Sequence, residues 1–161
     1  MNLASIFPGS VVFIDTNILI YSRTGKSQEC ARFLAECASG NVMAYTSTVV
    51  LAEFTHRMMM IECKEMGLTS ANPAKAMREQ PALVRNLSIY ADDVRQLLGG
   101  GITIEPALPQ DFLVALELQA QFGLLTADSL NLAIARRLGI NEIATSGKKF
   151  DNIQGLIVYK S

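Results

Sequence analysis

Residues that build many catalytic and metal sites are scarce in this sequence. It has one histidine, His56, no tryptophan, and three cysteines in 161 residues. The cysteines are odd in number and form no Cys-x-x-Cys pair, which argues against both a disulfide framework and a zinc site. We expect them to be small buried apolar residues in a reducing cytoplasm. With one histidine and no serine or cysteine nucleophile system to pair with it, hydrolytic chemistry would have to rest on carboxylates.

A strong charge of one sign and long apolar runs are also lacking. The formal net charge is −1 and charged residues make up 18% of the chain. Proteins that coat nucleic acid are usually basic, so nucleic-acid binding here would need a local patch. The apolar stretch 11–21 is short and contains Asp15, so we expect no membrane span. The first ten residues lack a basic start, so we expect no secretory signal. Hydrophobic residues, in contrast, make up 50% of the chain, which predicts a single domain, 1–161, with a sizeable core.

Short apolar runs alternate with helical patterns along the chain. Strands are expected at residues 11–14, 42–46, 102–104, 143–145 and 156–159. Helices are expected at 18–21, 27–38, 48–66, 109–123 and 126–138, the last capped by Thr126. This alternation predicts an α/β fold, a three-layer sandwich whose central sheet is mostly parallel. Two proline-initiated helices are expected within 73–98, and we predict that residues 70–98 form a helical arm.

Acidic residues are expected near the carboxyl ends of the strands, where open α/β sheets bind ligands. Asp15 ends the first strand, although a turn or helix-cap role explains it equally well. Glu53 lies close to the start of the helix that leaves the second strand, where composition alone favours a surface glutamate. Asp128 falls in a first helical turn, where an acid also complements the helix dipole. If the three converge, they form the oxygen-ligand site that Mg²⁺ and Mn²⁺ prefer, which can support phosphodiester cleavage.

Four segments also resemble the motifs of a known family, in order and spacing. They are residues 13–21 (FIDTNILIY), 51–54 (LAEF), 125–135 (LTADSLNLAIA) and 145–150 (TSGKKF). The first and third are fairly specific, and LAEF alone is weak. Together they resemble PIN domains, in particular the toxin-type ribonucleases of bacterial and archaeal toxin–antitoxin systems, and the likeness covers nearly the whole chain.

The resemblance implies a PIN-like fold and metal-dependent cleavage of RNA. By that resemblance Asp15, Glu53 and Asp128 would hold Mg²⁺ or Mn²⁺ and orient the attacking water. Thr16 and Asn17 would brace Asp15 by hydrogen bonding. The resemblance further implies a homodimer, silenced by a cognate antitoxin of a type II toxin–antitoxin pair.

The chain departs from the family pattern at Gly147, where PIN domains usually carry a fourth aspartate. The loss should weaken a second metal site most, and one Mg²⁺ needs only one or two carboxylates with waters and substrate phosphate, so we still expect a nuclease. Thr145 and Ser146 are expected as polar supports of the site. Lys148 and Lys149 are expected to contact phosphate.

Two other interpretations stay open. Gly147 favours a catalytically weakened PIN module that binds RNA or a protein partner without cutting. A metal-dependent phosphatase is disfavoured, because the second aspartate of aspartyl-phosphatase loops is replaced by Asn17.

Overall fold

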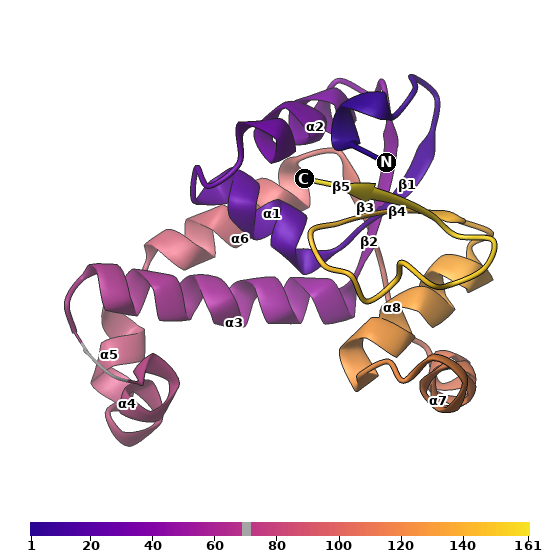
Figure 1. The fold of residues 1–161 in the computed structure, drawn as a ribbon. Coiled ribbons are helices and arrows are strands. Elements are labelled where there is room, and N and C mark those ends of the chain that lie inside the picture. The colour runs from indigo at the N-terminus through magenta and orange to yellow at the C-terminus, as the bar shows by residue number, and fades with distance from the viewer. Residues whose placement is uncertain (69–71) are drawn as a thin grey trace.

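A computed structural model describes residues 1–68 and 72–161, and its five strands form one parallel sheet in the order β3-β2-β1-β4-β5. The strands are β1 (Val11–Ile14), β2 (Met43–Ser47), β3 (Ile102–Glu105), β4 (Glu142–Thr145) and β5 (Ile157–Lys160). Helices α1 (Thr16–Arg23) and α2 (Gln28–Ala38) lie on one side of the sheet, and α7 (Pro109–Phe122) and α8 (Thr126–Arg137) lie on the other (Figure 1). This confirms the predicted three-layer α/β sandwich, with all strands parallel.

The core explains why the strands were recognisable in the sequence. Val12, Phe13 and Ile14 of the central strand β1 are at most 1% exposed, because helices cover both faces of a parallel sheet. All three cysteines are buried and free, as expected. Burial raises the pKa of the Cys37 thiol to about 12, which keeps it in the unreactive protonated form.

Local signals set the ends of several helices. Ser47 caps α3 (Thr48–Glu65) by accepting a 3.0 Å hydrogen bond from the Val50 amide. Gly123 ends α7 in the left-handed conformation, with φ 68°. Thr126 was predicted to cap α8 but is its first residue, and the capping position is occupied by Leu125, which offers no side-chain acceptor.

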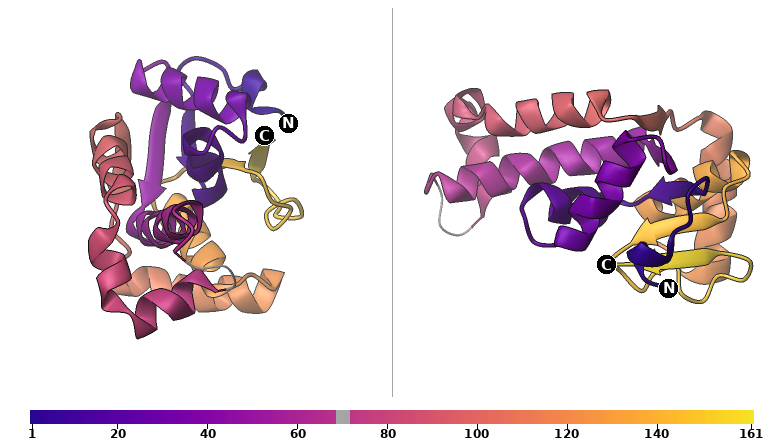
Figure 2. Two further views of the ribbon diagram at one scale, coloured as in Figure 1. Left: turned by 90° about the vertical axis from the view of Figure 1, so that its left-hand side faces the viewer. Right: turned by 90° about the horizontal axis from the view of Figure 1, so that it is seen from above.

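A helical arm extends from the sheet (Figures 1 and 2). It consists of the distal part of α3, which lies alongside α6 (Ile89–Gly99), with α4 (Pro73–Glu79) and α5 (Pro81–Asn86) at the tip. A small second core of Cys63, Met77 and Leu87 holds these helices together. The predicted arm is therefore present, although its predicted first residue, Ser70, lies outside the described residues.

The arm contains three helices between residues 73 and 99 where two were predicted. The buried carboxylate of Glu62, on α3, causes the extra break. It accepts hydrogen bonds from the amides of Ser88, Ile89 and Tyr90 at 2.8, 3.0 and 2.8 Å, so it satisfies the free N–H groups at which α6 begins. Burial by itself would raise the pKa of Glu62, but the bonds from Tyr90, Ser88 and Ile89 outweigh it and hold the pKa below its ordinary value.

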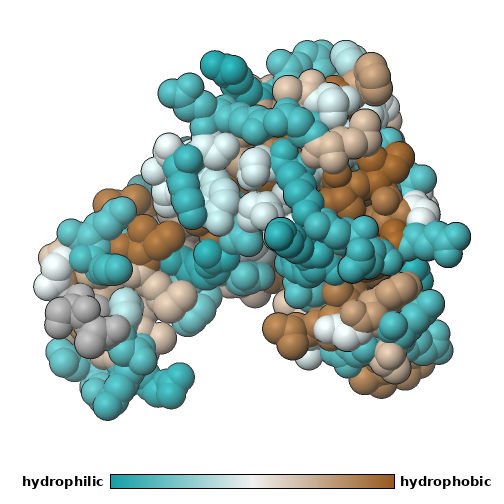
Figure 3. All heavy atoms as spheres, viewed as in Figure 1, coloured by the Kyte–Doolittle hydropathy of each residue, from teal (hydrophilic) through white to brown (hydrophobic). Residues whose placement is uncertain are grey.

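The two ends of the chain meet beside the edge strand β5. The amino group of Met1 donates a 2.8 Å hydrogen bond to the Val158 carbonyl, and the Lys160 amide donates one of 2.8 Å to the Met1 carbonyl. Within residues 1–68 and 72–161, no helix is both long and apolar enough to cross a membrane. Apolar side chains are exposed on α7, among them Phe112, Leu113 and Leu116, and apolar surface is visible in this region (Figure 3).

Candidate active site

The carboxyl ends of β1, β2 and β4 bring distant parts of the chain together. β1 leads into α1, β2 leads into α3, and β4 leads into the loop 146–156, while the start of α8 lies close by (Figure 1). This is the edge of an open parallel sheet at which ligands bind. Each acid expected from the sequence lies on one of these segments.

Asp15 directs its carboxylate into this edge. It occupies the capping position of α1 but makes no side-chain capping bond, so the helix-cap role left open by the sequence does not explain it. The Thr145 hydroxyl donates a 2.6 Å hydrogen bond to its Oδ2. The Nζ atom of Lys149 lies 3.2 Å from its Oδ1 and 3.1 Å from its Oδ2. The Asp15 carboxylate is therefore held by two groups, the Thr145 hydroxyl and the Lys149 ammonium.

Asp128 meets Asp15 through Lys149. The same Nζ atom that contacts Asp15 also forms an ion pair with Oδ1 of Asp128, in the first turn of α8. Burial alone would lower the pKa of the Lys149 ammonium, but the carboxylates of Asp15 and Asp128 outweigh it and raise the pKa above its ordinary value. The Asp128 side chain is 18% exposed and that of Asp15 only 3%, so solvent reaches the pair from the Asp128 side.

Glu53 is held apart from this pair by partners of its own. Its Oε2 accepts a 2.8 Å hydrogen bond from the Thr16 hydroxyl, and its Oε1 lies 3.6 Å from Nη1 of Arg57. That same Arg57 nitrogen donates a 2.6 Å hydrogen bond to Oδ1 of Asn17. Among the residues that the structure describes, no three acids, histidines or cysteines are close enough together to hold a metal ion. Asp15 and Asp128 therefore converge on Lys149, whereas Glu53 does not share that contact.

The bracing of Asp15 differs from the expectation. Thr16 and Asn17 were expected to brace it, yet they bond to Glu53 and Arg57, and the hydroxyl on Asp15 comes from Thr145. Helix α1 begins at Thr16 and carries its side chain toward α3, whereas β4 lies directly beside β1. Thr16 therefore braces Glu53 rather than Asp15, and Asn17 contacts Arg57.

The loop after β4 carries the remaining predicted residues. Ser146 is half-buried. Hydrogen bonding from Ser146, followed by the Lys26 ammonium, holds the pKa of the Tyr21 phenol below its ordinary value. Lys148 is exposed. Gly147 donates its amide to the Thr145 hydroxyl at 3.2 Å. A Cβ atom at position 147 would lie 3.9 Å from both Lys149 Cγ and Thr145 Oγ1, so this position adjoins the site and has room for a side chain.

Comparison with known proteins identifies the family. The family model described as PIN domain matches residues 12–156. The chain belongs to the PIN domain family. Among proteins with curated functions, none matches the sequence.

Solved structures share this fold. The VapBC2 complex from Rickettsia felis, bound to a DNA fragment from its promoter, has 18% identity and a TM-score of 0.61, over 94% of this chain and 98% of that one. DNA-bound VapBC from Salmonella typhimurium has 14% identity and a TM-score of 0.59, over 92% and 96%. VapC20 from Mycobacterium tuberculosis, a sarcin-ricin loop cleaving toxin, has 17% identity and a TM-score of 0.57, over 87% and 93%. At these identities the likeness establishes the fold of this PIN domain.

A buried contact that was not predicted positions α8 in this PIN domain. The Ser47 hydroxyl donates a 2.6 Å hydrogen bond to Oδ1 of Asn131, one helical turn beyond Asp128. It ties the helix that carries Asp128 to the end of β2. Asn131 is a polar residue in an otherwise apolar run, and that was the available signal in the sequence. Its buried Nδ2 has no hydrogen-bond partner among the described residues.

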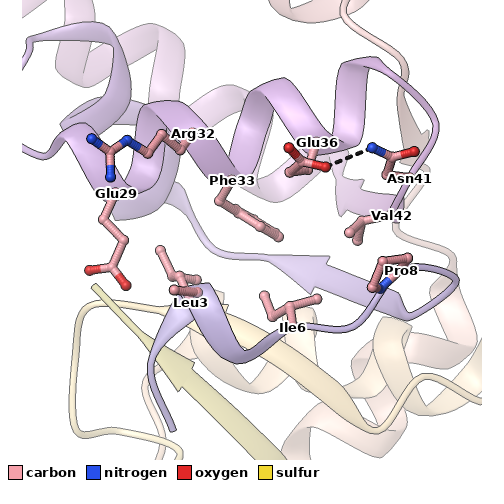
Figure 4. Close-up of a pocket in the computed structure, with 10 residues that line it drawn as sticks. Leu3, Ile6, Pro8, Glu29, Arg32, Phe33, Glu36, Asn41 and Val42 are labelled. Atoms are coloured by element: carbon pink, nitrogen blue, oxygen red, sulfur yellow. Dashed lines mark hydrogen bonds between the residues drawn. The ribbon is translucent and has the colours of Figure 1, made fainter.

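A separate cavity of about 300 Å³ lies near the amino ends of β1 and β2, away from the carboxyl ends that carry the acids. Leu3, Ile6 and Phe33 line it, with Glu29 and Glu36 at its rim (Figure 4). It is bordered by the residues that precede β1 and β2, whereas the carboxylates follow the strands. This cavity is therefore separate from the carboxylates of Asp15, Glu53 and Asp128.

The residues at the carboxyl edge suit a divalent cation. Asp15 and Asp128 already share one positively charged atom, the Nζ of Lys149. Carboxylate oxygens are the ligands that Mg²⁺ prefers, and one or two of them are sufficient when waters and a substrate phosphate complete the shell. The two carboxylates could therefore hold a cation, and at present the ammonium group of Lys149 contacts both of them.

Proposed function

We propose that this PIN domain is a metal-dependent endoribonuclease that cleaves RNA phosphodiester bonds, and that it is the toxin of a type II toxin–antitoxin pair. The observation that carries the proposal is the convergence of Asp15 and Asp128 on one cationic nitrogen at the carboxyl edge of the sheet. Membership of the PIN family and the likeness to solved toxin–antitoxin proteins support it.

In the proposed site Asp15 and Asp128 would hold Mg²⁺ or Mn²⁺, and Glu53, which does not share their contact with Lys149, would help to orient the attacking water. The cation would supply a nucleophilic water at neutral pH and stabilise negative charge on the phosphate. Thr145 fixes the direction of the Asp15 carboxylate. Glu53, whose side chain is 38% exposed, is kept in place by Thr16 and Arg57, so it can accept a hydrogen bond from a water beside the phosphate.

Positive side chains near the acids are the proposed phosphate contacts. Lys148 is exposed on the loop that carries Lys149, and Arg57 lies beside Glu53. Because the net charge of the chain is −1, such local cations would have to guide the RNA backbone. Salt should therefore weaken binding only modestly, since few phosphates are neutralised.

The proposed partners are a cognate antitoxin and a second copy of the chain, in the cytoplasm. Structural neighbours from Klebsiella pneumoniae and Haemophilus influenzae are described as a toxin–antitoxin complex and as VapBC-1. An antitoxin segment that covers Asp128 and Glu53, the more exposed acids, would block access to the site. Mass measurement of the purified protein in solution tests the homodimer.

A second candidate function is a catalytically weakened PIN module that binds RNA or a protein without cutting it. Gly147 supports this candidate, because a position that adjoins Thr145 and Lys149 carries no carboxylate. An RNA that is bound but remains intact with Mn²⁺ present would favour it.

The test is cleavage of an end-labelled single-stranded RNA by purified protein in Mg²⁺ or Mn²⁺, with EDTA as a control. We expect cleavage that EDTA and the Asp15→Asn substitution both abolish. Asp128→Asn, at a more exposed acid, gives a second inactive variant in case the buried change disturbs folding, and circular dichroism checks the fold of each. Cleavage that survives in folded Asp15→Asn and Asp128→Asn would contradict the assigned site.

A further inference from the structure

Lys149 holds a position that the sequence pattern did not suggest. Its Nζ lies 3.1 Å from Asp15 Oδ2 and is ion-paired with Asp128, so it stands between the two carboxylates that would ligate a metal. It was expected to face phosphate. Instead it neutralises part of the charge that would attract a divalent cation.

Two cations cannot occupy this place together. A divalent ion within ligand distance of both carboxylates would lie close to the ammonium, and like charges at such short range repel strongly. The ion also needs the carboxylate lone pairs that the ammonium now uses. Metal binding and the Lys149 ion pairs are therefore competing arrangements of the same two acids.

The surroundings of Lys149 allow it to leave. Its side chain is 26% exposed, while the next residue, Phe150, is 1% exposed and anchors the backbone in the core. Gly147 leaves open the space beside the lysine stem, where a Cβ would lie 3.9 Å from Lys149 Cγ. A side chain at position 147 would therefore contact the stem of Lys149, and glycine at 147 leaves that stem free on this side.

We propose that Lys149 is a tethered counter-ion that competes with the divalent cation for Asp15 and Asp128, and so raises the metal concentration at which this site fills. The inference rests on the proposed function only in naming Asp15 and Asp128 as ligands. It assigns to Lys149 a regulatory role in metal loading that differs from a phosphate contact.

Mn²⁺ binding to the full chain tests the proposal without any measurement of activity. The Mn²⁺ affinity of the wild type, Lys149→Met and Lys148→Met is measured by titration calorimetry or by the electron paramagnetic resonance signal of free Mn²⁺. Lys148→Met is the matched control, because it removes the same charge from the adjacent, exposed position. We expect Lys149→Met to bind Mn²⁺ about tenfold or more tightly than the wild type, and Lys148→Met to change the affinity far less.

A second readout follows from stability. Without metal, Lys149→Met leaves Asp15 and Asp128 without the cation that they share. Its melting temperature should therefore fall, and it should rise more on addition of Mn²⁺ than that of the wild type. Adding Asp128→Asn to Lys149→Met should remove the gain in affinity, which shows that the ion binds at these acids.

An Mn²⁺ affinity of Lys149→Met equal to or weaker than that of the wild type overturns the proposal, as does an equal gain in Lys148→Met. The outcome is independent of whether the chain is a nuclease. If Lys149→Met gains affinity but no variant cuts RNA, the counter-ion role stands and the proposed function fails. If the wild type cuts RNA and Lys149→Met gains nothing, the function stands and the counter-ion role fails.

Discussion

The hydroxyl of Thr145 donates a 2.6 Å hydrogen bond to Oδ2 of Asp15, across 130 residues of sequence. The bond is buried, and it fixes the one acid of the site that solvent barely reaches. Because β4 lies beside β1 in parallel register, the last residue of one strand faces the residue that follows the other. The parallel pairing thus brings the hydroxyl to the acid.

Replacing Thr145 by valine should test this contact. The change keeps the shape of the side chain and removes the donor, so Asp15 loses a partner that orients it. We expect RNA cleavage or Mn²⁺ affinity to fall about tenfold to a hundredfold, as is usual for residues that orient metal ligands. Loss of the buried bond should also lower the free energy of unfolding by about 1–3 kcal/mol.

Thr145→Ser is the matched control, because it keeps the hydroxyl. Cleavage kinetics at several Mn²⁺ concentrations and urea denaturation should show recovery in the serine variant. If the valine variant keeps the activity and stability of the wild type while the serine variant loses them, the methyl group rather than the hydroxyl matters and the positioning role is wrong.

Replacing Gly147 by aspartate should restore a carboxylate to the site. The position has room for a Cβ and does not adopt a left-handed backbone, so the fold should accept the change. A new acid beside Lys149 offers its ammonium another partner and adds an oxygen ligand near Asp15. We expect Mn²⁺ affinity or the rate of RNA cleavage to rise, by about tenfold.

Gly147→Asn controls for the size of the new side chain, since it has the same shape without the charge. Calorimetry with Mn²⁺ and the RNA cleavage assay compare the two. If neither affinity nor rate distinguishes aspartate from asparagine, position 147 does not serve the metal site.

The hydrogen bonds that Glu62 accepts from the start of α6 should make the stability of the protein depend on pH. Its pKa in the folded protein is below the ordinary value, so its ionised form stabilises the fold above the unfolded pKa of about 4.3. This stabilisation is lost as the pH falls through the lower, folded pKa. Glu62→Gln should therefore lower the free energy of unfolding by about 1–3 kcal/mol at pH 7, and the difference from the wild type should shrink at acid pH.

Chemical denaturation at neutral and acid pH measures this effect. Glu65→Gln, at an exposed position on the same helix, is the control and should change the stability little. A difference between the wild type and Glu62→Gln that stays constant down to acid pH would show that the charge of Glu62 is not what holds α6.

Much of the fold could be predicted from the sequence, because its determinants are local. The apolar run 11–14 indicates a strand buried on both faces, and Gly123 and the prolines at 73, 81 and 109 mark helix ends. The convergence of Asp15 and Asp128 also follows from a local rule, since one ends a strand and the other begins a helix. The division of residues 81–99 into two helices could not be predicted, because its cause is Glu62, which lies 26 residues before Ser88.

The ion pairs of the site could not be predicted from the sequence either, because they join residues that lie far apart in the chain. Lys149 is 134 residues from Asp15, and no periodicity indicates which basic side chain will fill the space between two acids. The basic residue beside Glu53 is a partial exception: Arg57 is four positions on in the same helix, a spacing at which opposite charges meet. The redirection of Thr16 and Asn17 toward Glu53 and Arg57 depends on how α1 packs against α3.

The pairing of residues near position 15 with residues near position 145 has a consequence for biosynthesis. A chain is synthesised from its amino end, so β1 and β2, with α1 to α3, are made long before β4. Neither Thr145 nor Lys149 can reach Asp15 until the ribosome has made the 130 and 134 residues that separate them from it. A nascent chain thus carries Asp15 without its hydroxyl and its ammonium until β4 and the loop that follows it have been made.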